Sequence, residues 1–217
     1  MLQQQIRNLT ERLVGYARLV EDMIEQTAEV LSTRDPAPLA DVLGEKERRA
    51  NELEVEMDAA ATEVIAQFQP KARDLRTVLM VLRITNDLER LGDHAVNIAG
   101  AVRWLLANAP RQDLSAVPRM ARAAVGMIDD AIRAFIAGDA ALARRICASD
   151  QTVDDIASGI LRDAVAAMAG NPSSIEAGLH VLKIAGNLER IADLATNIGE
   201  DLIYMVEGRV IKHHREG

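Results

Sequence analysis

The stretch NDLERLGDHAVNIA, residues 86–99, recurs as GNLERIADLATNIG at residues 186–199. Six residue types keep their spacing without a slip. Leu88, Glu89, Arg90, Asp93, Asn97 and Ile98 reappear as Leu188, Glu189, Arg190, Asp193, Asn197 and Ile198. Repetition at a constant offset of 100 residues indicates a tandem duplication.

The duplication extends upstream of this phrase. An offset of 103 aligns Leu39-Ala40 with Leu142-Ala143, and it aligns Glu47 and Asn51 with Asp150 and Asp154. The offset changes between two predicted helices, where insertions are tolerated. We therefore predict two copies of a three-helix unit, residues 1–108 and residues 109–217, joined by a connector at about 107–118.

Composition and punctuation indicate an all-α protein. Ala, Leu, Ile, Met, Glu and Arg dominate, which are good helix formers, and only 2% of the residues are aromatic. Proline and glycine are sparse, and the stretches between them have the length of helices. The predicted helices span about 3–31, 39–68, 71–107, 118–137, 139–169 and 172–207. Six long helices favour two pseudo-symmetric three-helix bundles.

The charge balance and the cysteine content exclude several classes of protein. A net charge of −8 argues against sequence-independent binding of nucleic acid, which needs a concentrated basic face. The single cysteine, Cys147, excludes an intramolecular disulfide framework and fits a reducing compartment. No early apolar segment resembles a secretory signal, and no run reaches the roughly 18 apolar residues of a membrane span. We expect a cytoplasmic protein without membrane insertion.

The repeated phrase has two chemically different faces. On a helical wheel, one stripe is apolar and predicts the core face: Ile84, Leu88, Leu91, Ala95, Ile98 and Val102. Glu89, Asp93 and Asn97 follow one another at intervals of four, so they form a column on an exposed stripe. The second copy carries the same column as Glu189, Asp193 and Asn197.

These columns predict cation binding. Like charges at i and i+4 repel, and carboxylate and amide oxygens are the ligands that hard cations, iron and manganese prefer. The fifth predicted helix adds Asp150 and Asp154, so four carboxylates converge if that helix lies beside the sixth. The first copy offers Glu47 and Asn51 there, one carboxylate fewer. The alternative is an ordinary solvated acidic face, with Arg90 and Arg190 as counter-charges.

The same residues resemble the PhoU family, the accessory proteins of phosphate-specific transport systems. LERLGDHAVNIA and LERIADLATNIGEDLIYMVEGRVIKHH are similar to the third and sixth helices of that family. The stretch from Pro70 to Arg76, P-x-x-x-DLR, resembles the start of its third helix. The stretch from Asn51 to Asp58, N-x-x-E-x-E-x-D, resembles its second. The resemblance covers almost the whole chain and is weakest over the first helix.

The resemblance implies a cytoplasmic, commonly homodimeric, negative regulator of phosphate uptake and of the phosphate-starvation response. It implies an adaptor, not an enzyme, between the ATPase subunit of the phosphate ABC transporter and a membrane sensor histidine kinase. It also implies multinuclear metal sites, in which Fe, Zn, Mn or Mg is held by acidic pairs. By position these pairs are Glu89/Asp93, Asp150/Asp154 and Glu189/Asp193, while Glu47/Asn51 departs from the pattern.

Two other functions stay open at this point. A di-iron carboxylate oxidase needs inward Glu-x-x-His pairs, and none of the four histidines (His94, His180, His213 and His214) follows a glutamate at that spacing. A helical scaffold that binds partners without metal is the third hypothesis. The chain has no phosphate-cradling Gly-rich loop, no Cys/His metal spacing and no nucleophile elbow.

Overall fold

The computed structural model describes residues 1–109 and 113–207, and these residues form helices and short connections without a strand. Seven α-helices and two short helical turns follow one another along the chain. They are α1 (Leu2–Thr33), α2 (Ala37–Asp41), η1 (Val42–Lys46), α3 (Glu47–Phe68), α4 (Ala72–Asn108), α5 (Val117–Ala137), α6 (Ala140–Gly170), η2 (Pro172–Ser174) and α7 (Ile175–Glu207). The predicted all-α class and the two three-helix repeats are confirmed.

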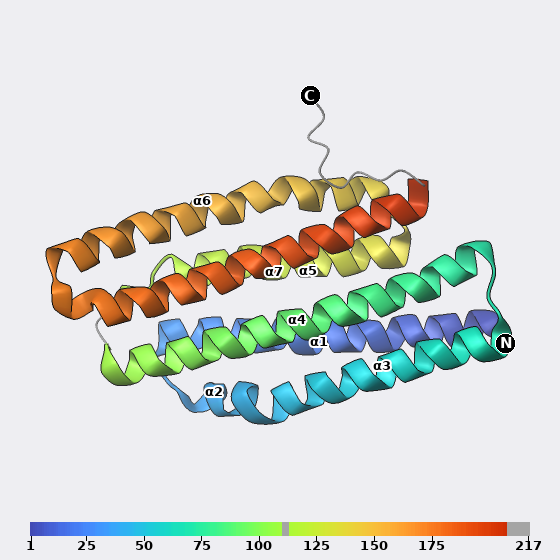
Figure 1. Cartoon of the computed structure of the whole chain (residues 1–217), viewed down its shortest axis with the longest axis horizontal. Coiled ribbons are helices and arrows are strands. Elements are labelled where there is room, and N and C mark those ends of the chain that lie inside the picture. The colour runs from blue at the N-terminus through green and yellow to red at the C-terminus, as the bar shows by residue number, and fades with distance from the viewer. Residues whose placement is uncertain (110–112, 208–217) are drawn as a thin grey trace.

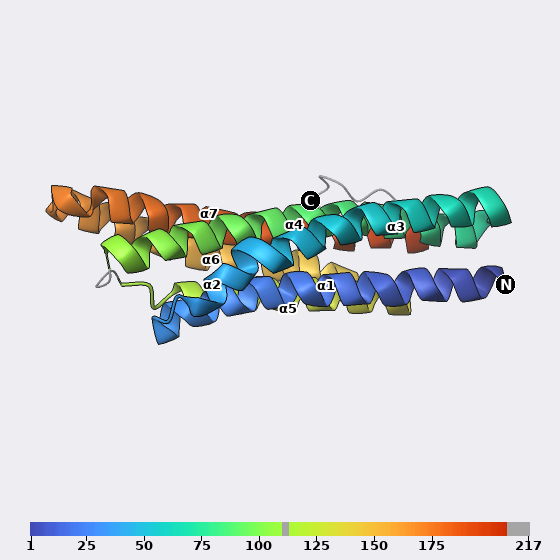
Figure 2. The ribbon, with the colours of Figure 1, turned by 90° about the horizontal axis from the view of Figure 1, so that it is seen from below.

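The helices pack in two layers. In Figure 1, α3, α4, α7 and α6 lie side by side, with α4 and α7 in the middle. Figure 2 shows α1 and α5 together behind this layer, so each repeat is a triangle of one back helix and two front helices. The acidic phrases therefore stand on the two central helices of the front layer.

The core follows the apolar stripe that the sequence predicts. Leu88 and Leu91 of α4 and Leu188 and Ile191 of α7 are at most 1% exposed. The other predicted core residues of α4 are also buried: Ile84, Ala95, Ile98 and Val102. Because these residues share one face of the helix, the acidic residues between them are directed away from the core.

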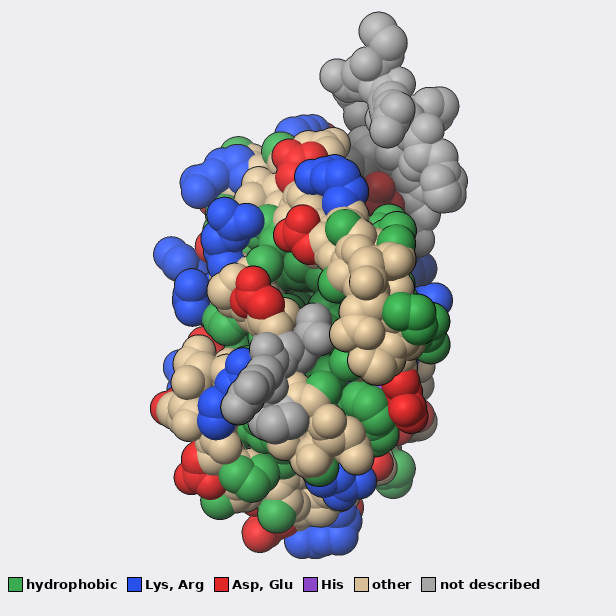
Figure 3. Space-filling view, turned by 90° about the vertical axis from the view of Figure 1, so that its left-hand side faces the viewer, with side chains coloured by type: hydrophobic (Ala, Val, Ile, Leu, Met, Phe, Trp, Pro, Cys, Tyr) green, Lys and Arg blue, Asp and Glu red, His purple; other side chains and the backbone are tan. Residues whose placement is uncertain are grey.

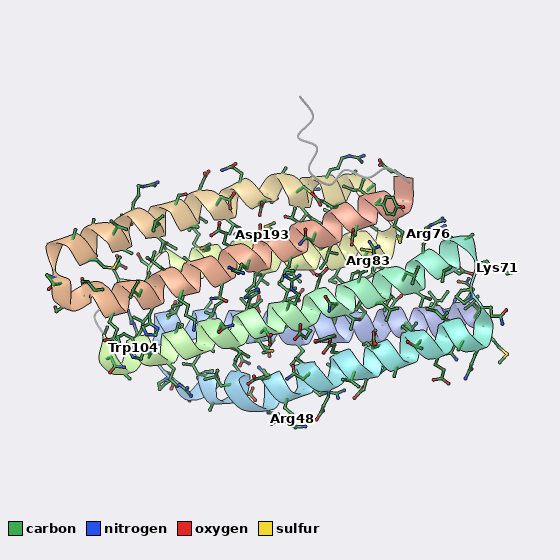
Figure 4. The ribbon with its side chains drawn as sticks, viewed as in Figure 1. Arg48, Lys71, Arg76, Arg83, Trp104 and Asp193 are labelled. Atoms are coloured by element: carbon green, nitrogen blue, oxygen red, sulfur yellow. The ribbon has the colours of Figure 1, made fainter. Side chains whose placement is uncertain are left out.

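Side-chain contacts join the two repeats along α4 and α7. Arg83 Nη1 lies 3.0 Å from Asp201 Oδ2, as Figure 4 indicates by the direction of Arg83 toward α7. His94 Nδ1 hydrogen-bonds with Asn187 Oδ1 at 2.8 Å. At the far end of the seam, Trp104 stacks on the ring of His180 with 4.1 Å between the ring centroids.

Most helix ends lie close to the boundaries predicted from proline and glycine. Gly138 has a φ of 65° and ends α5, and the next residue, Asp139, caps α6 by accepting from the Ala141 and Leu142 main-chain N–H groups. The third predicted helix begins one residue later than expected, because Lys71 is extended and α4 begins at Ala72. The predicted second helix is also divided, since the π-helical turn η1 separates α2 from α3.

The ends of the bundle are mixed in character. Figure 3 shows hydrophobic side chains exposed among Asp, Glu, Lys and Arg at the end where α6 joins α7. Leu179 of α7 is 57% exposed there, and Leu161 and Val165 of α6 are each 50% exposed. No helix in the described ranges has a stretch long and apolar enough to cross a membrane.

Candidate metal centres

Four carboxylates gather between α6 and α7 in the second repeat. Asp150 and Asp154 lie one turn apart on α6, and Glu189 and Asp193 lie one turn apart on the neighbouring α7. Figure 4 places Asp193 midway along α7, on the side toward α6. We call Asp150, Asp154, Glu189 and Asp193 the second-repeat cluster.

Burial and the neighbouring carboxylates raise the pKa of three of these four groups. Burial raises the pKa of Asp150 from its ordinary 3.8 to about 6, and the charges of Asp154, Asp193 and Glu189 contribute to the rise. Burial and then Asp154 likewise raise the pKa of Glu189 and of Asp193, while Arg190 lowers both. Within the described residues, no ion pair within 4.0 Å neutralises any member of the cluster.

A smaller acidic group lies between α3 and α4 in the first repeat. The two helices approach closely where a Cβ on Gly92 would stand 3.8 Å from the Cβ of Ala50. Burial raises the pKa of Glu89, and the nearby carboxylates Asp93 and Glu54 raise it further. We call Glu54, Glu89 and Asp93 the first-repeat cluster.

Glu54 was missed in the sequence analysis, which placed Glu47 and Asn51 in this site. Glu47 is the first residue of α3, and Asn51 is exposed one turn later; both line a shallow surface groove beside Arg48. Figure 4 shows Arg48 at the outer edge of the front layer, away from α4. Glu54 follows them on the same stripe, at i+7 from Glu47, so an extended heptad count would have found it.

The two asparagines of the acidic columns are exposed. Asn97 donates its side-chain N–H to the main-chain oxygen of Asp93 at 3.0 Å, which leaves its amide oxygen for another partner. Asn197 occupies the matching position one turn after Asp193 and is also exposed. Both remain available as oxygen ligands at the ends of the columns.

The donor set of both clusters consists of oxygen atoms. Carboxylate oxygens are preferred ligands of Mg²⁺, Mn²⁺ and iron, whereas softer metal ions prefer thiolate ligands. In the conformation observed, no three Asp, Glu, His or Cys side chains of the described ranges stand together closely enough to hold an ion. The chemistry of the oxygen donors nevertheless fits a hard cation, and burial together with neighbouring carboxylates raises the pKa of Glu89, Asp150, Glu189 and Asp193.

Histidine contributes to neither cluster in the described part of the chain. His94 faces Asn187 and His180 stacks on Trp104, so both belong to the seam between the repeats. His213 and His214 lie outside the described residues. The arrangement therefore lacks the Glu-x-x-His pairs of a di-iron oxidase at residues 1–109 and 113–207.

Comparison with known proteins identifies the family. The family model of the PhoU domain matches the chain twice, at residues 13–102 and at residues 117–202. The chain belongs to the PhoU family. The phosphate-specific transport system accessory protein PhoU homolog of Aquifex aeolicus is 31% identical over 97% of this chain and 95% of its own length. The homolog of Caulobacter vibrioides is 31% identical over 98% and 92%.

Solved PhoU structures have the same fold. PhoU from Pseudomonas aeruginosa superimposes with a TM-score of 0.90 at 28% identity, over 96% of this chain and all of the other. The phosphate transport system regulatory protein PhoU from Streptococcus pneumoniae gives a TM-score of 0.89 at 26% identity, over 97% and 99%. The all-helical architecture of this PhoU-family chain is therefore that of its relatives.

The raised pKa of Asp150 predicts an unusual pH dependence of stability in the metal-free PhoU-family chain. Because the folded-state pKa lies above the unfolded value, Asp150 stabilises the fold fully below pH 3.8, and this contribution is lost as the pH rises through about 6. Asparagine does not titrate, so the free energy of unfolding of Asp150→Asn should rise relative to that of the unaltered chain as the pH increases. We expect this relative rise to be about 1 kcal/mol on going from about pH 4 to about pH 7.5, after allowance for solvent screening. Urea unfolding with a chelator measures the difference.

Asp163→Asn is the matched control for this prediction, since it removes an exposed carboxylate from the same helix. Its stability relative to the unaltered chain should not change over the same pH range. If Asp150→Asn were stabilised equally at both pH values, the stabilisation would not come from the titration of Asp150.

Proposed function

We propose that this chain is an accessory protein of a phosphate-specific transport system and represses phosphate uptake and the phosphate-starvation response. The match of the PhoU domain to both repeats carries the proposal. The relatives named above are accessory or regulatory proteins of phosphate transport, and they align over nearly the full chain. The proposed role is regulatory and not enzymatic.

The partners we propose are the ATPase subunit of the phosphate ABC transporter and a sensor histidine kinase. Both would be reached from the cytoplasm, where this chain would act as an adaptor, and a homodimer is part of the proposal. Two separate charged surfaces support such a bridge, since the clusters lie on different halves of the front layer. Electrostatic complementarity would then select a basic surface on each partner.

We further propose that each acidic cluster binds a hard divalent or trivalent cation, with Fe, Mn or Mg favoured over Zn by the oxygen ligands. Asp150, Asp154, Glu189 and Asp193 would hold it in the second repeat, and Glu89 and Asp93 in the first. The ion would supply positive charge that cancels the repulsion within each cluster. The carboxylates would orient around it and present a reshaped surface to partners.

A metal-independent adaptor is the second candidate. The observed spacing favours it, because no three ligating side chains of the described residues converge as they stand. In that case the uncompensated carboxylates would serve directly as a docking surface for basic side chains. Partner binding that is unaffected by a chelator would support this candidate over the metal-dependent one.

A gene-deletion experiment tests the proposed regulation. Removing the gene should raise expression of phosphate-starvation genes in phosphate-rich medium, and the unaltered gene should restore repression. The variant that combines Asp93→Ala with Asp193→Ala should restore it poorly if the cation sites are required. Normal repression in the deletion strain would refute the regulatory role itself.

A further inference from the structure

A buried hydroxyl without a partner lies beneath the first-repeat cluster. The side chain of Tyr16 is 0% exposed, and its hydroxyl has no hydrogen-bond partner among the described residues. Buried polar groups are almost always paired, so an orphan hydroxyl calls for a physical explanation. The ring of a buried tyrosine is stabilised by hydrophobic contacts, but its hydroxyl usually finds a hydrogen-bond partner.

Three acidic residues of the first repeat act electrostatically on this hydroxyl. Tyr16 lies midway along α1, the back helix, which packs against both α3 and α4. Burial raises the pKa of Tyr16, and the charges of Glu54, Glu89 and Asp93 raise it further, in that order. The phenol is therefore protonated and close to carboxylates, which can only accept the hydrogen bond that it can donate.

The second repeat has no counterpart of this hydroxyl. Helix α1 ends at Thr33 and α5 ends at Ala137, and each is followed by a residue in the left-handed region, Arg34 or Gly138. This offset of 104 pairs buried positions of α1 with buried positions of α5: Leu13 with Val117, Tyr16 with Met120, Ala17 with Ala121, Val20 with Ala124 and Ile24 with Ile128. A methionine thioether cannot donate, so the two clusters differ in chemistry.

We propose that Tyr16 is a positioning residue of the first-repeat cation site: its hydroxyl has no partner as the side chains stand, and when an ion binds it donates a hydrogen bond to Glu54 and turns the other carboxylate oxygen toward the ion. The inference rests on the proposed cation binding. It explains how the first repeat manages without a carboxylate at Asn51, since Glu54 supplies one from the next turn of α3. Groups that orient a ligand in this way commonly change metal affinity by about 10- to 100-fold.

The test isolates one site at a time in the full-length chain. Asp154→Asn with Asp193→Asn leaves the first site, and Glu89→Gln with Asp93→Asn leaves the second. Mn²⁺ is titrated by calorimetry into each of these variants, with and without Tyr16→Phe. We expect Tyr16→Phe to weaken Mn²⁺ binding about tenfold or more at the first site and to leave the second site unchanged.

An ultraviolet difference spectrum gives a readout that a purely structural role would not move. Mn²⁺ should perturb tyrosine absorbance in the variant that keeps the first site, and Tyr16→Phe should abolish the signal. Tyr204 is the only other tyrosine and is 45% exposed, so Tyr204→Phe is the matched control and should keep the signal. Thermal unfolding of metal-free Tyr16→Phe should be unchanged or shifted upward, because an unpaired buried oxygen is removed.

Unchanged affinity of Tyr16→Phe at the first site would overturn the inference, as would an equal loss at both sites, which indicates general destabilisation. Binding at the second site but not at the first in the parent variants would also overturn it while leaving cation binding in place. An absence of Mn²⁺ binding at both sites would instead refute the proposed cation binding, and this inference with it.

Discussion

The variant that combines Asp93→Ala with Asp193→Ala should lose the cations that the unaltered chain retains after loading with Fe²⁺ or Mn²⁺ and desalting. Each substitution removes a carboxylate from one cluster, so both sites are affected together. Loss of a direct ligand should weaken binding by about 100-fold or more, since even residues that only orient a ligand account for 10- to 100-fold. Inductively coupled plasma mass spectrometry measures the ions retained per chain.

The control for this result is Glu63→Ala with Asp163→Ala. It removes the same charge from exposed positions of α3 and α6 that belong to neither cluster. The control should retain ions at the level of the unaltered chain, and circular dichroism should show the helices intact in both variants. Equal retention in the two double variants would show that Asp93 and Asp193 are not ligands.

Leu88→Ala should cause a large loss of stability. Leu88 is fully buried on α4, so its truncation removes apolar contacts and leaves a cavity. We expect the free energy of unfolding to fall by about 2 to 5 kcal/mol in urea titrations. Leu79→Ala on the same helix, where the side chain is 43% exposed, should cost about 1 kcal/mol or less. Similar losses for the two would contradict the orientation of α4.

Most of the fold was predictable because helical periodicity and the duplication agree. Residues 88–98 and 188–198 place apolar side chains at i, i+3, i+4 and i+7, and the structure buries them as expected. Gly138 and Asp139 also marked a helix boundary correctly, since their backbone roles depend on local chemistry. Local signals failed at η1, which divides the helix predicted at residues 39–68.

The candidate sites were predictable in the second repeat and only partly in the first. Asp150 and Asp154 were matched to Glu189 and Asp193 on the condition that the fifth helix lies beside the sixth, and α6 does pack against α7. Glu54 was not found, because its counterpart at the offset of 103 is Ala157 and the repeat therefore gave no signal. The proposed role of Tyr16 could not be predicted from the sequence either. Tertiary packing decides which face of α1 lies against α3 and α4.

The aromatic stack at the end of the seam has a practical consequence. Trp104 is the only tryptophan of the chain, and its indole ring belongs to one repeat while the imidazole of His180 belongs to the other. Indole fluorescence is sensitive to what the ring contacts, so the emission of Trp104 should change if the contact with His180 is lost. A rearrangement that separates the halves can be followed without attaching any dye.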